Sequence, residues 1–194
     1  MIETLEQWDR ELMLFLNGLH APFLDFPMEL ISGVATWFPL YALLLYGLGK
    51  KYGWSRWWLW VLAPVLTVAM TDWISVNLFK EVFERYRPSH NLEIQDLLHY
   101  VGDYRGGQFG FVSSHATTSF GIATIMTWMY RNRKIALAMY IWAAIVSYSR
   151  IYLGVHYPGD IAGGILLGLT IGCFTGWLFT TVHQKKWGSL PSWT

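Results

Sequence analysis

At 194 residues the chain is long enough for one domain and gives no reason to expect a second core. Hydrophobic residues make up 54% of the sequence and charged residues only 14%, compared with roughly 25% charged residues in an average soluble domain, which favours a membrane protein. The formal net charge of +1 excludes nucleic-acid binding through bulk positive charge, and the single cysteine, Cys173, excludes an intrachain disulfide framework.

Residues 1–31 mix apolar positions with polar ones such as Glu11, Asn17 and Asp25. This mixture is too polar for a typical membrane span and is characteristic of amphipathic helices that lie at the membrane interface. We therefore expect interfacial helices here, with a sixth membrane crossing as the alternative. Acidic rather than basic residues occupy the N-terminus, so we expect no cleaved signal peptide.

Four or five apolar runs follow that are long enough, or nearly so, to cross a bilayer core of roughly 30 Å, the fourth being free of charge only over Ile135–Tyr148. They cover approximately residues 33–50, 57–79, 112–130, 135–153 and 159–182. The sequence thus predicts an all-α fold, a polytopic transmembrane helical bundle of five spans, or six if the N-terminal segment also crosses. In this interpretation residues 1–194 form one membrane-integral domain, with interfacial helices over 1–31, the bundle over 32–182 and a cytoplasmic tail over 183–194.

Basic residues gather in three connectors that alternate along the chain. They are Lys50, Lys51 and Arg56 after the first run, Arg131, Arg133 and Lys134 after the third, and Lys185 and Lys186 after the fifth. Alternate connectors of a multi-span protein lie on the same side of the membrane, and short connectors rich in Lys and Arg lie in the cytoplasm. We therefore expect these connectors and the C-terminus to face the cytoplasm.

Three polar clusters interrupt the apolar sequence at the other, extracytoplasmic end of these runs. They are KEVFERYRP at Lys80–Pro88, SSH at Ser113–His115 and SRIYLGVHYPGD at Ser149–Asp160. Charged and imidazole side chains at the edge of a hydrophobic bundle are candidates for a functional site, and their presence on one side favours a common pocket. Cations can hold a phosphate, one imidazole can attack it and the other can protonate the leaving oxygen, so the clusters indicate phosphoryl transfer.

In the first cluster, Lys80, Glu84 and Arg87 have the i, i+4, i+7 spacing of one helix face, which would aim both cations the same way if the helix continues that far. Pro88 disfavours the helical conformation at Arg87, so we expect the helix to end there. Asp72 lies deeper in the same run, where we expect a buried acid with a structural partner.

The second cluster places Ser113 and Ser114 before His115 at the start of the third run. Hydroxyl groups at a helix start cap free backbone N–H groups, and the same N–H groups can instead bind an anion. Both interpretations apply to the two serines. His115 is then placed to give a proton to the leaving oxygen.

The third cluster contains Arg150, His156 and Asp160, with Pro158 at a position that suits the first turn of a helix. Glycines then recur every four residues, at Gly164, Gly168, Gly172 and Gly176. This stripe predicts close packing against a neighbouring helix, and Asp160 shares the packed face because it lies four residues before Gly164. Asp160 can then accept from one nitrogen of His156 and leave the other free to attack, so we interpret His156 as the nucleophile.

The order and spacing of the clusters resemble the three signatures of the type-2 phosphatidic acid phosphatase superfamily. Lys80, six residues and Arg87-Pro88 match the first signature, and Ser149-Arg150, five residues, His156, three residues and Asp160 match the third. Val112-Ser113-Ser114-His115 resembles the second, usually Pro-Ser-Gly-His, from which Val112 and Ser114 depart. The resemblance implies a covalent phosphohistidine on His156, with catalytic His115 and Asp160 and a phosphate held by Lys80, Arg87, Ser113, Ser114 and Arg150.

We expect no metal and no other cofactor, because the cations beside the histidines would repel a divalent ion and no His–carboxylate cluster at ligand spacing accompanies them. The substrate classes that the resemblance implies are phosphatidic acid or phosphatidylglycerol phosphate, undecaprenyl pyrophosphate, and the 1-phosphate of lipid A. The small size favours a multi-pass enzyme of the bacterial inner membrane whose site faces the periplasm or the outside.

Two other functions stay open at this point, together with the oligomeric state. A lipid acceptor in place of water would make the protein a lipid-to-lipid phosphotransferase. A non-enzymatic lipid-phosphate binder or carrier could use the same cations, although it would not need two positioned imidazoles. Residues 88–111 form the longest polar connector, which fits either a lid over the substrate or a solvated loop.

Overall fold

The structure of the chain, a computed structural model, describes residues 2–190 and 192–193 and consists of helices and loops, with no β-strand in this part. The expected all-α class is therefore confirmed.

The main helices are α1 (Ile2–Gly18), α2 (Pro22–Ser32), α3 (Phe38–Tyr52), α4 (Trp57–Ile74), α5 (Glu81–Phe83), α6 (Ser114–Tyr130), α7 (Arg133–Tyr152) and α8 (Pro158–Trp187). A π-helical segment, Ser75–Lys80, joins α4 to α5, and short 3₁₀ helices cover Ala35–Trp37, Trp54–Arg56, Pro88–His90 and Gln95–Leu97. Residues 1, 191 and 194, which the expected interfacial segment and tail include, lie outside the described residues.

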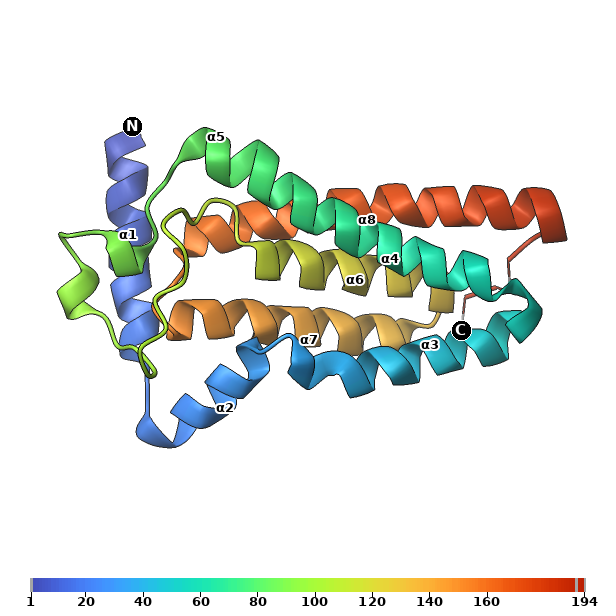
Figure 1. Cartoon of the computed structure of the whole chain (residues 1–194), viewed down its shortest axis with the longest axis horizontal. Coiled ribbons are helices and arrows are strands. Elements are labelled where there is room, and N and C mark those ends of the chain that lie inside the picture. Colours follow the sequence, from blue (N-terminus) through green and yellow to red (C-terminus); the bar gives the residue numbers. More distant parts are fainter. Residues whose placement is uncertain (1, 191, 194) are drawn as a thin grey trace.

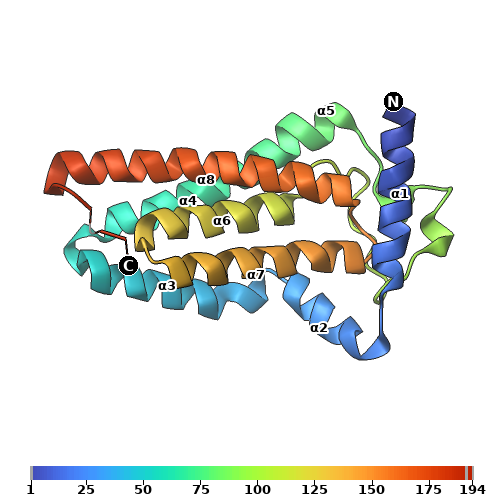
Figure 2. The same ribbon diagram turned by 180° about the vertical axis from the view of Figure 1, so that it is seen from behind.

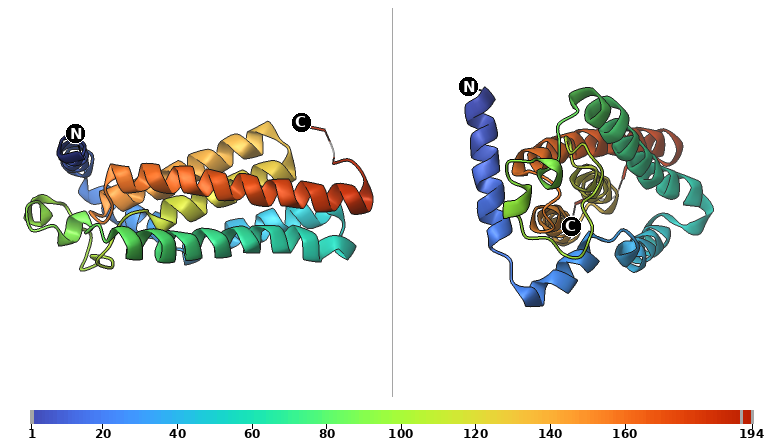
Figure 3. Two further views of the ribbon diagram at one scale, coloured as in Figure 1. Left: turned by 90° about the horizontal axis from the view of Figure 1, so that it is seen from above. Right: turned by 60° about the vertical axis from the view of Figure 1, so that its left-hand side comes forward.

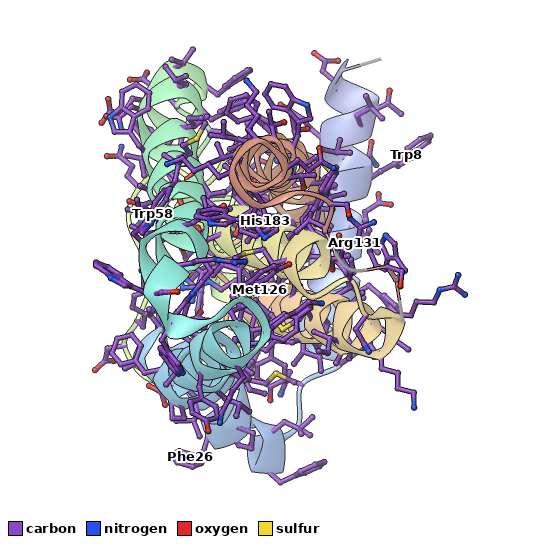
Figure 4. The ribbon with its side chains drawn as sticks, turned by 90° about the vertical axis from the view of Figure 1, so that its right-hand side faces the viewer. Trp8, Phe26, Trp58, Met126, Arg131 and His183 are labelled. Atoms are coloured by element: carbon purple, nitrogen blue, oxygen red, sulfur yellow. The ribbon has the colours of Figure 1, made fainter. Side chains whose placement is uncertain are left out.

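Helix α6 forms the centre of the bundle. It packs against α4, α7 and α8 (Figures 1 and 2). Residues on different sides of this helix are buried, such as Ala123, Ile125 and Met129. Figure 4, viewed along the bundle, shows Met126 of α6 at its middle. A helix that is buried on several sides lies inside a bundle, so the third apolar run provides the core that the other helices surround.

The glycine stripe of α8 packs closely on a neighbouring helix, as its four-residue spacing predicts, and this neighbour is α6. A Cβ atom added to Gly168 would lie 2.3 Å from the carbonyl oxygen of Thr117, and one added to Gly164 would lie 2.8 Å from the carbonyl oxygen of Ser113. Both obstacles are backbone atoms, which cannot move aside without shifting α6. The stripe therefore sets the distance between the helices that carry the second and third polar clusters.

Three helical stretches of the described chain are long and apolar enough to cross a membrane. They are Trp54–Phe83, Arg133–Tyr152 and Pro158–Trp187. Pro22–Ser32 and Ala35–Tyr52 meet this condition only as a pair, and the pair is bent by 75°. The expected helical bundle thus has three or four candidate membrane spans by length and composition, fewer than the five or six that the sequence predicts, because α6 is short, at 17 residues, and enclosed.

Helix α1 lies across one end of the bundle, roughly at right angles to the long helices (Figures 1 and 3). One face of α1 packs on the bundle through Asp9, Met13 and Asn17, at i, i+4 and i+8. A second face carries exposed apolar side chains: Leu5, Trp8, Leu12, Phe15 and Leu19. Figure 4 shows Trp8 pointing away from the bundle, and the polar residues Glu3, Gln7 and Glu11 form a third face. The helix is thus divided into protein-facing, apolar and polar sectors.

The basic connectors lie at the other end of the bundle from α1. The α3–α4, α6–α7 and post-α8 connectors all meet there (Figure 1), and the Nζ of Lys51 donates a hydrogen bond to the carbonyl oxygen of Tyr130, which joins two of them. The three polar clusters lie at the α1 end. The separation of basic connectors from polar clusters, which the sequence predicts, is therefore present in the fold.

Candidate active site

The first cluster follows a path that the sequence did not predict. Lys80 ends the π-helical segment, and the helix stops at Phe83 because Glu84 adopts the left-handed conformation, with φ 45°. The expectation that Lys80, Glu84 and Arg87 share a helix face is therefore wrong. Arg87 itself is extended, with φ −67° and ψ 158°, as its position before Pro88 predicts.

A return loop brings Arg87 back to the site. Its backbone N–H donates to Gln108 O at 3.0 Å, and its Nε donates to Phe109 O at 3.1 Å. A Cβ on Gly106, which has φ +70°, would lie 2.6 Å from the Nη1 of Arg87, so glycine is needed there both for its conformation and for space. The Nη1 atom is buried and has no hydrogen-bond partner among the described residues, which leaves a donor for a ligand.

The second cluster begins α6 and uses its two serines differently. Ser113 is the N-cap, and its Oγ accepts from the backbone N–H of Ala116 at 3.5 Å. The side chain of Ser113 is fully buried in this role. The Oγ of Ser114 instead accepts from Lys80 Nζ at 2.7 Å and lies 2.8 Å from Ser75 Oγ. Capping is thus confirmed for Ser113, whereas Ser114 contacts a cation of the first cluster.

His115 faces a cavity of about 320 Å³ between α2, α3, α4, α6 and α7. Ser114 and Asp72 line the same cavity, together with Ser32 and the aromatic ring of Trp37. The expectation that Asp72 is a buried acid is wrong, because its side chain is exposed at this cavity. Apolar side chains make most of the exposed wall, and the polar ones come from α2, α4 and the first turns of α6.

Arg150, at the end of α7, is 3% exposed and is held on two sides. Its Nη1 donates to Ser32 Oγ, and its Nη2 donates to Tyr104 OH at 3.2 Å. The Nε atom is buried without a hydrogen-bond partner in the described part of the chain. Arg150 therefore resembles Arg87: both guanidinium groups are fixed by protein contacts and keep one buried N–H group unused.

His156 and Asp160 form a buried pair in which the exposed fraction of the side chains is 1% and 0%. The Nδ1 of His156 lies 3.3 Å from Asp160 Oδ2, which also accepts from the backbone N–H of Tyr157 at 3.0 Å. Burial, with the positive charges of Arg87, Arg150 and Lys80, holds the pKa of His156 well below its usual value. The low pKa favours the neutral imidazole at pH 7, and the tautomer with its proton on Nδ1 would direct that proton at Asp160 and leave Nε2 unprotonated.

The family follows from a profile match. The sequence profile of the PAP2 superfamily matches residues 60–187, which contain all three clusters. The chain belongs to the PAP2 superfamily. A lipid A 4'-phosphatase of Bacteroides thetaiotaomicron is 40% identical over 193 residues, covering 99% of this chain and 84% of the relative. A lipid A 4'-phosphatase of Porphyromonas gingivalis is 37% identical over 188 residues, covering 97% of this chain and 80% of the relative.

A solved PAP2 structure has the same fold. The crystal structure of a transmembrane PAP2-type phosphatidylglycerolphosphate phosphatase from Bacillus subtilis aligns with a TM-score of 0.70 at 20% identity, covering 94% of this chain and 88% of that one. The expected superfamily and the expected enzyme class, a hydrolase that removes phosphate from a membrane lipid, are thereby confirmed.

The site includes residues that the sequence patterns did not indicate. Arg85 donates from Nη1 to Asp160 Oδ1 at 2.9 Å, although it lies within the first cluster. Arg85 could have been identified from the sequence, because a buried carboxylate such as Asp160 needs a cationic partner and Arg85 was the arginine of the first cluster without an assigned role. Tyr104 and Gly110 come from the long connector, and a Cβ on Gly110 would lie 2.8 Å from Asp160 Oδ2. No local pattern marks these two, because their partners are distant in sequence.

Proposed function

We propose that this PAP2 phosphatase removes the 4'-phosphate of lipid A, or of a closely similar glycolipid, through a phosphohistidine on His156. The proposal is supported first by the two lipid A 4'-phosphatases that match nearly the whole chain at 37–40% identity. The observation that carries it is the meeting of unused buried guanidinium donors, a neutral buried histidine and His115 at one end of the bundle.

The phosphate group would lie between the three cations. The free Nη1 of Arg87 and the free Nε of Arg150 point to buried positions where an anion would satisfy them, and Lys80 adds a third positive charge. The N-terminus of α6 contributes the backbone N–H groups of Ser114 and His115, which have no carbonyl partner within the helix. Such fixed donors stabilise the charge on the phosphoryl oxygens in the transition state.

The reaction would take place in two steps. In the first, the Nε2 lone pair of His156 forms a bond to phosphorus, the bond from phosphorus to the lipid oxygen breaks, and His115 gives that oxygen a proton. In the second, water attacks the phosphohistidine, His115 takes the proton of the water, and the P–N bond breaks to release inorganic phosphate. Asp160 keeps the Nδ1–H of His156 in place and balances its positive charge during both steps.

The lipid chains would enter from the bilayer between α3 and α4. A second cavity of about 360 Å³ lies there, with a wall made by apolar side chains and the ring of Tyr41. It shares Tyr41, Val68 and Ala69 with the cavity that His115 faces. The two cavities are therefore neighbours, and together they would give the lipid chains an apolar route toward His115 at the start of α6.

The finer topology is part of this proposal. Helices α3, α4, α6, α7 and α8 would cross the membrane, and α1 would lie at its surface with its apolar sector in the lipid and its polar sector in water. The eight basic residues of the connectors support a cytoplasmic location for that end and the C-terminus, in the bacterial inner membrane. The catalytic clusters would then face the periplasm.

Phosphate release from defined lipids tests the substrate assignment. The purified protein in detergent should release phosphate from lipid A at a higher kcat/KM than from undecaprenyl pyrophosphate, phosphatidylglycerol phosphate or phosphatidic acid. Mass spectrometry of the product should show the 1-phosphate retained and the 4'-phosphate lost. Preference for one of the other lipids would overturn the assignment of lipid A as the substrate.

Two further measurements test the reaction. His156→Ala should abolish phosphate release in a folded protein. Labelled phosphate on a lipid acceptor, instead of as free inorganic phosphate, would support the alternative function of lipid-to-lipid phosphotransfer.

A further inference from the structure

Helix α1 contacts both ends of the segment that carries the third polar cluster. Near its start, Asp9 Oδ1 accepts from the backbone N–H of Gly159 at 2.7 Å, at the first turn of α8. Near its end, Asn17 Nδ2 donates to the carbonyl oxygens of Ile151 and Tyr152 at 3.1 and 2.8 Å, at the last turn of α7. Both proposed catalytic residues of the third cluster, His156 and Asp160, lie between or next to these two attachments.

The attachment at Asp9 continues to the proposed catalytic carboxylate through one guanidinium group. Arg85 Nη2 donates to Asp9 Oδ2 at 2.7 Å, and Arg85 Nη1 donates to Asp160 Oδ1 at 2.9 Å. The exposed fraction of the side chains falls from 25% at Arg85 and 14% at Asp9 to 0% at Asp160. Arg85 also lies over the ring of Tyr157, 4.3 Å from its centroid, which fixes the plane of the guanidinium group.

In this chain of contacts the two oxygens of Asp160 have different partners. Oδ1 is occupied by Arg85, while Oδ2 receives Tyr157 N and lies against His156 Nδ1. A carboxylate with a filled Oδ1 cannot rotate to exchange its oxygens, so Oδ2 stays directed at the imidazole. Arg85 is itself well held: burial alone would lower its pKa, but the negative charges of Asp160 and Asp9 raise the pKa above its ordinary value.

We propose that Asp9 and Arg85 are positioning residues, through which α1 holds Asp160 in the orientation and charge state that His156 needs to attack phosphate. This inference rests on the proposed roles of His156 and Asp160. The chemistry of the reaction does not require a group from α1, so the assignment adds a function to an N-terminal helix whose polar and apolar sectors otherwise suggest only membrane contact. Asn17 supports the same segment at its other end.

Two variants with a matched control test the positioning role. Asp9→Asn keeps an oxygen for Gly159 N–H but loses the charge that holds Arg85, and Arg85→Gln removes the cation from Asp160. We expect Asp9→Asn to lower kcat about tenfold and Arg85→Gln to lower it by about 100-fold, with KM changed less than about twofold in both. Arg85→Lys should recover part of the loss. Glu11→Gln makes the same carboxylate-to-amide change on the exposed face of α1 and should leave kcat unchanged.

The double variant identifies the route of the effect. If Asp9 acts through Arg85, the double variant Asp9→Asn, Arg85→Gln should have the kcat of Arg85→Gln alone, because coupled residues are not additive.

The outcomes separate this inference from the function on which it rests. An inactive His156→Ala beside fully active Asp9→Asn and Arg85→Gln would overturn the positioning role alone. Additive losses in the double variant would also overturn it, because they would show that Asp9 acts independently of Arg85. An active His156→Ala would overturn the proposed mechanism itself. Thermal unfolding of each variant in detergent identifies any loss of activity that comes from misfolding. If Arg85→Gln fails to fold, the kcat of Asp9→Asn, which leaves the side-chain volume unchanged, tests the positioning role.

Discussion

The Nζ of Lys80 donates a hydrogen bond of 2.7 Å to the Oγ of Ser114, which joins the end of the π-helical segment to the start of α6. Ser114 stands where the resembling signature usually has glycine. Its hydroxyl is also 2.8 Å from Ser75 Oγ, so it is fixed from two sides. The departure from the signature therefore has a structural consequence: the serine sets the direction of the ammonium group that we assign to the phosphate.

Ser114→Ala should weaken substrate binding more than it slows the chemical step. A hydrogen bond to a charged group contributes about 1.5–3 kcal/mol, so the loss should raise KM about tenfold or more, with a smaller change in kcat. Thr118→Ala is the matched control, because Thr118 lines the same cavity and bonds to Thr71 instead of Lys80. Equal changes in KM for the two variants, measured by phosphate release, would contradict the assignment.

His115→Ala should affect substrates according to their leaving group. General acid catalysis contributes about 10²–10⁴-fold and matters most when the leaving oxygen is basic. We therefore expect a loss of that size with a lipid alkoxide and a much smaller loss with p-nitrophenyl phosphate, whose phenolate leaves without a proton. Steady-state kinetics with both substrates measures the difference. Equal losses would mean that His115 only binds phosphate.

The protonation state of His156 can be followed directly. Because burial and three neighbouring cations lower its pKa, the ring should stay neutral as the pH falls through 6.5, the ordinary value, and should protonate only at lower pH. Histidine ¹⁵N NMR, with His156→Gln to assign the signal, measures the midpoint. Arg87→Gln removes one positive charge and should move the midpoint to higher pH. Lys134→Gln, at the other end of the bundle, should not, and a midpoint at or above 6.5 in the unmodified protein would refute this account.

The helices and the close packing of the glycine stripe on a neighbouring helix could be predicted from the sequence because they depend on local periodicity, whereas the identity of that neighbour, α6, could not. The four-residue glycine spacing predicts close packing whichever helix is the partner, and the five apolar runs coincide with α3, α4, α6, α7 and α8. The residues assigned to the phosphate site, Lys80, Arg87 and Arg150, could be identified because they lie in polar clusters that follow one another in a recognisable order along the chain. How close these three side chains come to one another depends on the fold.

What could not be predicted depends on contacts between distant segments. The helix ends at Phe83 because the backbone of Arg85 and Arg87 bonds to the return loop at Gln108 and Gly110, which is not visible in local propensity. Asp72 is exposed because it lines a cavity whose wall comes from five helices that are distant in sequence. The Asp9–Arg85–Asp160 contacts join three parts of the chain that are far apart in sequence.

Gly168→Ala should destabilise the bundle. The added Cβ would lie 2.3 Å from Thr117 O and 3.0 Å from Gly121 N, so α6 and α8 would have to move apart. Overpacking of this kind costs about 1–3 kcal/mol, which corresponds to a fall in Tm of about 2–12 °C for a chain of this size. Gly107→Ala is the control, because no atom lies within 4 Å of the added Cβ. An unchanged Tm for Gly168→Ala would show that the two helices tolerate separation.

The orientation in the membrane follows from charge, and cysteine labelling can measure it. The eight basic residues of the three connectors lie at one end of the bundle, and the exposed Asp103 lies in the long connector at the other. In a Cys173→Ser background, Asp103→Cys should therefore react with an impermeant thiol reagent in intact cells, because short Lys- and Arg-rich connectors stay in the cytoplasm. Lys134→Cys, at an exposed position in the first turn of α7, is the matched control and should react only after the membrane is opened. The reverse pattern would place the catalytic clusters inside the cell and would exclude lipids of the outer leaflet as substrates. If α1 and α2 cross the membrane instead of lying at its surface, the N-terminus changes side but Asp103 does not, so this measurement tests the position of the site independently of the N-terminal helices.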